Sequence, residues 1–293
     1  MEYALIVLST VLFGGQFIAL NAYQDKNGKS SKSIFLFLMI FSLIATFVFL
    51  CASGFKIGYL NFTLLYAVIA AVLQIILQIA GIKALSKGRV EVYTLFNVAG
   101  GMGVAYIFGV TYFQEALKIP HLIGLVLIIV ALIVPIIFSK LEKKKGTWIF
   151  YLLCVLVFLS NGFFGVTNKI HINSSQGLSI QEYLFYVYLS IFIVSTVAFA
   201  ISLFKKDEQT KLLFNWKALL FAALYGTLNG VGMFLQYFYA DVVPASILFP
   251  LSNAGAMVFS FIIGLIAYRK KPTIPDIIQF AIAAIGMGLF FIP

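Results

Sequence analysis

Charged residues are scarce in this chain. They make up 10% of its 293 residues, hydrophobic residues make up 62%, and the mean hydropathy is +1.05. A soluble domain averages about 25% charged residues, so too few are present here to cover a surface that faces water. The chain has 20 Lys and Arg against 10 Asp and Glu. In a soluble protein that excess would suggest nucleic acid, but its distribution between apolar stretches leads us to expect no nucleic-acid partner.

Residue groups typical of catalytic and metal sites are also missing. The two cysteines, Cys51 and Cys154, fall inside apolar stretches, so no disulfide is expected. The two histidines, His121 and His171, are isolated from each other and show no metal-ligand spacing. No phosphate-binding loop precedes a helix, and no nucleophile lies beside a candidate base. We therefore expect no enzyme activity, no cofactor and no metal.

Long apolar stretches fill the chain instead. A membrane-spanning helix needs roughly 20 apolar residues. Ten stretches qualify: 3–23, 33–53, 60–82, 92–113, 119–139, 148–168, 181–204, 216–240, 245–267 and 274–292. The first is not a cleavable signal peptide by pattern, because Glu2 is its only early charge and no basic region precedes it. Since backbone in lipid must satisfy its own hydrogen bonds, the sequence predicts an all-α integral membrane protein with ten transmembrane helices.

The basic residues lie on alternate connections. Of the 20 Lys and Arg, 17 fall between stretches 1 and 2, 3 and 4, 5 and 6, 7 and 8, and 9 and 10, and 3 fall in the rest of the chain. Basic connections stay in the cytoplasm. We therefore expect a multi-pass protein of the cell membrane with both termini outside the cytoplasm.

The two halves of the chain resemble each other. "AGGMGVAYIFGVTYFQEALKIP" (99–120) returns as "AGAMVFSFIIGLIAYRKKPTIP" (254–275), and "LFGGQFIALN" (12–21) returns as "LSNGFFGVTN" (159–168). We divide the chain into a first repeat (1–139), a basic linker (140–146) and a second repeat (147–293). Five spans per repeat force the second into the membrane upside down, and inverted repeats of this kind are typical of secondary transporters.

At family level, the chain resembles the ten-helix EamA-like permeases of the drug/metabolite transporter superfamily. The most specific piece is "FQEALKIPHLIGLVLIIVALIV" (113–134), which is similar to the family's Gly-Glu-Arg-Leu-Thr run before a Gly-rich fifth helix. Gln114 and Glu115 stand where that run has Gly-Glu, and Lys118 is the nearest base. The counterpart "YRKKPTIPD" (268–276) lacks the acid. The resemblance implies transport of small metabolites. It also implies cytoplasmic termini, which the basic residues contradict.

Amide side chains mark the first, third, fourth, sixth, eighth and ninth stretches. With two nearby tyrosines they form the candidate substrate-binding set: Gln16, Gln74, Gln78, Tyr93, Asn97, Asn161, Asn168, Tyr225, Asn229, Gln236 and Asn253. We expect a polar cavity between these six helices, with the other four outside. The alternative for any single amide is a helix-to-helix hydrogen bond. Tyr237 and Tyr239, near the end of a stretch, are expected in the interfacial aromatic belt.

Ionisable residues are missing from the middle of every stretch. Lys83, Glu91, Glu115, Lys169 and Asp241 lie within a turn or two of an end, where both lysines are expected to snorkel to the interface. This pattern favours a transporter of a small polar or zwitterionic metabolite (an amino acid, nucleoside or sugar) by facilitated diffusion or exchange. The alternatives are a multidrug or organic-cation exporter, and a membrane sensor or assembly partner that transports nothing. The expected partners are a small-molecule substrate and the lipid bilayer, with the protein a monomer or homodimer.

Overall fold

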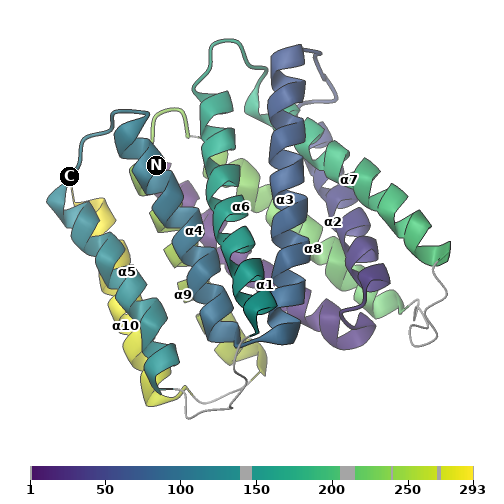
Figure 1. Cartoon of the computed structure of the whole chain (residues 1–293). Helices are drawn as coiled ribbons and strands as arrows, with labels where there is room; N and C mark the ends of the chain where they lie inside the picture. Colours follow the sequence, from purple (N-terminus) through teal and green to yellow (C-terminus); the bar gives the residue numbers. More distant parts are fainter. Residues whose placement is uncertain (1, 139–146, 205–214, 239, 269–271, 293) are drawn as a thin grey trace.

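The computed structural model describes residues 2–138, 147–204, 215–238, 240–268 and 272–292. These residues contain no strand and form ten helices, each long and apolar enough to cross a membrane (Figure 1). The helices are α1 (Glu2–Asn27), α2 (Ser31–Ala52), α3 (Asn61–Lys87), α4 (Val90–Thr111), α5 (Ile119–Phe138), α6 (Trp148–Ile172), α7 (Ile180–Phe204), α8 (Trp216–Tyr237), α9 (Ala245–Tyr268) and α10 (Ile274–Gly288). A short 3₁₀ turn, Leu289–Phe291, follows α10. The prediction of an all-α fold with ten helices of membrane-spanning length and hydropathy is confirmed. The predicted linker 140–146 lies outside the described residues.

Local sequence sets several helix ends. Ser30 and Thr147 precede α2 and α6, and each side-chain oxygen accepts a hydrogen bond from a backbone N–H of the first turn. That bond satisfies a donor that has no partner within the helix. Gly28 and Gly54 follow α1 and α2 with φ of 71° and 64°, a conformation that glycine adopts without steric cost. Short polar connections therefore separate the long apolar helices.

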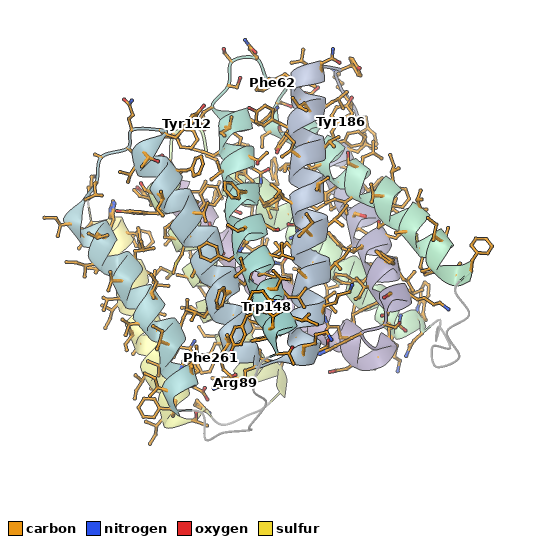
Figure 2. All side chains as sticks on the ribbon, in the orientation of Figure 1. Phe62, Arg89, Tyr112, Trp148, Tyr186 and Phe261 are labelled. Carbon is orange, nitrogen blue, oxygen red and sulfur yellow. The ribbon has the colours of Figure 1, made fainter. Side chains whose placement is uncertain are left out.

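The helices pack as a central group with a pair at each edge. In Figure 1, α5 lies beside α10 at one edge, and α2 and α7 lie at the opposite edge. Between them, α1 packs against α8 and α9, and α6 packs against α3 and α4. The side chains in Figure 2 fill the spaces between these ribbons. The six helices that the amides mark in the sequence therefore form the centre of the molecule.

Glycines allow two of the central crossings to be close. Where α4 crosses α6, a Cβ on Gly100 would lie 2.3 Å from the backbone oxygen of Phe158. Where α1 crosses α9, a Cβ on Gly14 would lie 2.7 Å from the backbone nitrogen of Ser260. Small residues let helix backbones approach in this way where lipid supplies no hydrophobic driving force.

The helices alternate in direction, so the connections alternate between two ends of the molecule. One end, called here the terminus end, holds both chain termini and the connections α2–α3, α4–α5, α6–α7 and α8–α9 (Figure 1). The other, the basic end, is where α1 leads into α2 and α3 into α4. The described residues in or beside these two connections include Lys26, Lys29, Lys32, Lys87 and Arg89.

Candidate functional site: a central amide-lined cavity

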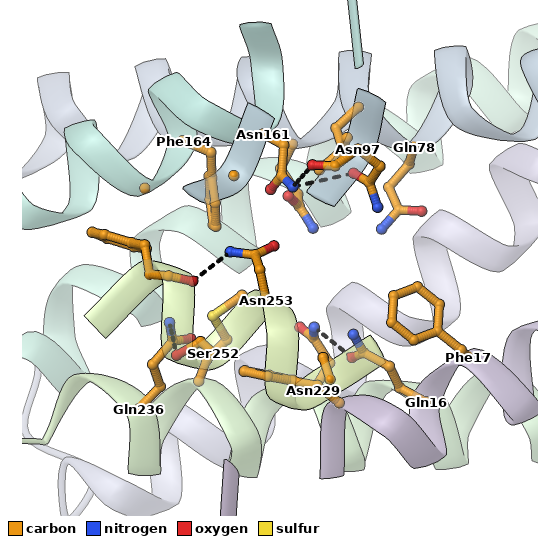
Figure 3. A pocket seen from close by; sticks show the side chains of 18 of the residues that line it. Gln16, Phe17, Gln78, Asn97, Asn161, Phe164, Asn229, Gln236, Ser252 and Asn253 are labelled. Carbon is orange, nitrogen blue, oxygen red and sulfur yellow. Dashed lines mark hydrogen bonds between the residues drawn. The ribbon is translucent and has the colours of Figure 1, made fainter. Parts of the chain in front are cut away.

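A cavity of about 140 Å³ lies between the six central helices (Figure 3). Its walls come from α1, α3, α4, α6, α8 and α9, and α2, α5, α7 and α10 contribute no residue. Gln16 and Gln74, at the middles of α1 and α3, place it near half the depth of the bundle. Ten of the eleven candidate residues line it: Gln16, Gln74, Gln78, Tyr93, Asn97, Asn161, Tyr225, Asn229, Gln236 and Asn253.

Two sequence expectations at the terminus end of the cavity are wrong. Asn168 does not line the cavity: it is fully buried, accepts a hydrogen bond from the Tyr183 hydroxyl (2.6 Å) and donates one to the Tyr237 oxygen (2.9 Å). Tyr237 is 2% exposed and lines the cavity, so it does not belong to an interfacial belt. Tyr239 lies outside the described residues. Asn168 therefore positions Tyr237, which lines the cavity, but does not line the cavity itself.

Three amides from three helices meet on one wall. Asn161 of α6 donates from its amide nitrogen to the backbone oxygen of Asn97 (2.8 Å) and to its side-chain oxygen (3.1 Å), both on α4. Asn253 of α9 donates to the backbone oxygen of Phe249 (2.9 Å). Gly101 of α4 leaves room for both, because a Cβ there would lie 2.6 Å from the Asn161 nitrogen and 2.6 Å from the Asn253 oxygen. Figure 3 shows these amides facing the cavity.

The opposite wall carries a second group of amide bonds. Asn229 of α8 donates to the side-chain oxygen of Gln16 on α1 (2.9 Å), and the Tyr188 hydroxyl of α7 donates to the Asn229 oxygen. Gln78 of α3, which lies beside Asn97 in Figure 3, donates to the Tyr225 oxygen of α8 (3.1 Å). Several candidate amides therefore both line the cavity and join helices.

Gln74 differs from the other amides. Its side chain is 4% exposed, and its oxygen is buried without a hydrogen-bond partner. Neither end of its amide bonds to another residue in the part of the chain that the structure describes. It is therefore the cavity amide with the most unused hydrogen-bonding capacity.

The sequence reasoning missed the aromatic part of the wall. Phe13, Phe17, Phe164 and Phe249 line the cavity, as does Ser252, which accepts a hydrogen bond from the Gln236 nitrogen (3.0 Å). On α1 a signal was present, because Phe13 and Phe17 lie three residues before and one residue after Gln16. Residues at i, i+3 and i+4 share a helix face. No Asp, Glu, Lys, Arg or His is among the described residues that line the cavity.

Comparison with known proteins supports the fold. No protein-family model matches the chain, and no curated protein matches it either. A solved structure titled "Crystal structure of protein" matches with a TM-score of 0.76 over 97% of this chain and 94% of that one. The two share 14% sequence identity, so the likeness concerns the fold alone.

One buried and one partly buried charge hold the α8–α9 connection at the terminus end. Lys169 of α6 donates from its ammonium to the backbone oxygens of Ala240 and Val243. It is 2% exposed, so the expectation that it snorkels is wrong. Glu115, after α4, accepts hydrogen bonds from the backbone nitrogens at the start of α9, Ala245 (2.6 Å) and Ser246 (2.8 Å). The N-terminus of α9 stabilises the negative charge of Glu115, and the two backbone oxygens stabilise the positive charge of Lys169.

Further bonds join the two halves of the chain at the same end. The Glu182 carboxylate of α7 accepts from the backbone nitrogen of Gly58 (2.7 Å). The Thr63 hydroxyl of α3 lies 3.0 Å from the His171 ring nitrogen and accepts from the backbone nitrogen of Leu178 (3.0 Å). These bonds tie the two halves together at the terminus end. At the basic end the halves also pack against each other, where the Phe150 ring of α6 lies against Ala84 of α3 and against Gly88.

Proposed function

We propose that this protein is a secondary transporter that moves a small polar or zwitterionic metabolite across a membrane by alternating access. The observation that carries the proposal is the cavity near half depth, lined by amides and aromatic rings from three helices of each half. Small-molecule sites combine apolar walls with a few oriented polar groups in this way. A cavity of about 140 Å³ is small beside drug-sized sites of roughly 300–1,000 Å³, which favours a small cargo.

The packing supports an inverted repeat as part of this proposal. If α1–α5 correspond to α6–α10, the contacts of α1 with α8 and α9 correspond to those of α6 with α3 and α4. Under the same correspondence the two helices of each contacting pair, α2–α7, α4–α9 and α5–α10, exchange places. Gly100 and Gly255, which share a place in the repeated sequence, both lie at central crossings. Two opposed repeats give a transporter two nearly equivalent ways to open.

The bonds at the terminus end suit alternating access. Because Lys169, Glu115 and Glu182 tie the elements together there, we propose that cargo in this conformation exchanges through the basic end. In the alternative state the bonds of Glu115, Lys169 and Glu182 would open and the basic end would close. With the basic connections in the cytoplasm, the present state faces inward. The drug/metabolite transporter type, which the sequence resembles, is the family we propose.

The lack of Asp, Glu, Lys, Arg and His among the described residues of the cavity wall favours facilitated diffusion or exchange over proton coupling. Intramembrane acids and bases are the usual carriers of coupled protons. The carboxylate of Glu115 is held by the α9 N-terminus.

Flux through purified protein tests this function. Proteoliposomes that contain the protein should equilibrate at least one labelled small polar metabolite faster than empty liposomes. The matched control is a variant with cysteines at positions 58 and 182, where the Gly58 backbone meets the Glu182 side chain. A disulfide between them would lock the terminus end, and a reductant would cleave it. Crosslinking should stop flux, and reduction should restore it. A protein that binds metabolites but equilibrates none would be a sensor.

A further inference from the structure

The hydrogen-bonding atoms left free in the cavity restrict the chemistry of the cargo. Asn161 and Asn253 each donate to a backbone oxygen, that of Asn97 and that of Phe249. A backbone oxygen can only accept, so these bonds fix which end of each amide is the nitrogen. The side-chain oxygens of Asn161 and Asn253 have no partner among the described residues. Both remain free as acceptors in the cavity wall.

Gln236 presents a third free oxygen. The Ser252 hydroxyl donates its hydrogen to the backbone oxygen of Leu248 (2.7 Å), so it can only accept from Gln236. The amide nitrogen of Gln236 is therefore occupied, and its oxygen is left without a partner in the described structure. The walls from α6, α8 and α9 thus offer three free acceptor oxygens, together with the hydroxyl groups of Tyr225 and Tyr237, which accept from Gln78 and Asn168.

Gln74, on the α3 wall, has both ends of its amide free. Burying an amide without a partner costs roughly 1–3 kcal/mol in proteins, and a ligand that bonds to it removes this cost. Gln74 is also 4% exposed, so water outside the cavity does not serve it.

The wall holds no charged side chain that could pair with a formal charge on the cargo, because no described residue that lines the cavity is charged. Lys169 and Glu115 are engaged elsewhere: the Lys169 ammonium bonds to two backbone oxygens, and Glu115 occupies the N-terminus of α9. Burying an unpaired carboxylate or ammonium costs far more than burying a hydroxyl that finds an acceptor.

We infer that the cargo is an uncharged metabolite with several hydroxyl or N–H donors, of the sugar or nucleoside class, and that Gln74 hydrogen-bonds it directly. The free oxygens of Asn161, Asn253 and Gln236 accept from its other donors. The rings of Phe17 and Phe164 provide apolar surface for its ring. This inference rests on the proposed transport function and narrows it, because it excludes amino acids and organic cations.

Four labelled probes test the cargo class in proteoliposomes: D-glucose, uridine, L-serine and choline. Uptake of D-glucose or uridine should exceed that of empty liposomes and of both charged probes. Uptake of L-serine or choline at or above the rate of both uncharged probes would overturn the inference and leave transport standing. Uptake of none of the four would overturn the transport function and the inference with it.

The role of Gln74 is tested by Gln74→Met, with Gln279→Met as the matched control. Gln279 lies on α10, away from the cavity, and its nitrogen meets only the sulfur of Met257 (3.8 Å). Gln74→Met should raise the half-saturating concentration of the transported uncharged probe about 5- to 30-fold, the effect of losing roughly 1–2 kcal/mol of hydrogen bonding. Gln279→Met should leave it unchanged.

Thermal stability separates binding from a structural role for Gln74. Because Gln74 has no partner in the described structure, Gln74→Met should keep or raise the thermal midpoint of the unliganded protein. A fall of several degrees, failure to fold, or a half-saturating concentration equal to that of Gln279→Met would each overturn the assignment.

Discussion

A single methyl group added at Gly101 should disturb the cavity, whereas the same methyl at Gly103 should not. Both residues lie in the interior of α4. A Cβ at Gly101 would lie 2.6 Å from the amides of Asn161 and Asn253, and a Cβ at Gly103 would meet no atom within 4 Å. Gly101→Ala and Gly103→Ala therefore share one chemical change on one helix and differ in what the methyl meets.

The expected magnitudes follow from the contacts. Gly→Ala inside a helix gains about 0.5–1 kcal/mol from backbone entropy, so Gly103→Ala should be slightly stabilising. At Gly101 the same gain is offset when the methyl displaces Asn161 from its two bonds to Asn97, 2.8 and 3.1 Å long. Each such bond contributes about 0.6 kcal/mol on average in a membrane, so the two variants should differ by about 1–2 kcal/mol. A shift of roughly 2–4 °C per kcal/mol makes this difference measurable.

The assay compares the thermal midpoints of both variants in detergent with their uptake in proteoliposomes. Gly101→Ala should have the lower midpoint and reduced uptake of the transported probe, and Gly103→Ala should match the wild type or exceed its midpoint. Equal midpoints and equal uptake in the two variants would refute the convergence of Asn161 and Asn253 over Gly101.

Three further predictions concern the ends of the molecule. Lys169→Met should lower the thermal midpoint by several degrees because it leaves two backbone oxygens buried without a donor. Glu115→Gln should lower the midpoint less because the amide oxygen still accepts one N–H. A Lys169→Met midpoint equal to that of the wild type would contradict this prediction. A fluorescent protein that matures only in the cytoplasm should stay dark when fused to the C-terminus, and bright cells would reverse the proposed topology. An imposed pH difference should change initial uptake less than about twofold, since no Asp, Glu, Lys, Arg or His lines the described cavity. Strong accumulation would show that an acid such as Glu115 or Asp241 takes part.

The sequence predicted the helices and most of the candidate site because both depend on local patterns. The stretch expected at 148–168 is α6 (Trp148–Ile172), and the one expected at 92–113 is α4 (Val90–Thr111). Amides near the middle of an apolar helix must face other protein rather than lipid, because an unpaired amide in lipid is costly. That requirement brings eight of the nine candidate amides to one cavity.

Asn168 shows where this reasoning ends. It lies seven residues after Asn161 on α6, which is nearly the same helix face but about 10 Å closer to the terminus end. At that depth Tyr183 and Tyr237 fill the space and bond to it. The sequence indicates the face of a helix, but the depth at which the cavity ends depends on side chains from other helices.

By itself, the sequence determined the number of spans, their alternation, the one-sided placement of basic residues and the helices that carry polar groups. The tertiary structure decided which of those groups are used and which are free. Asn229 is bonded to Gln16, 213 residues away, whereas Gln74 has no partner among the described residues. It also decided that Lys169 is held by the α8–α9 connection and does not reach the interface. The reason is physical: an apolar run acts through its own hydropathy, but a hydrogen bond needs a partner that only the packing of distant helices brings within about 3 Å.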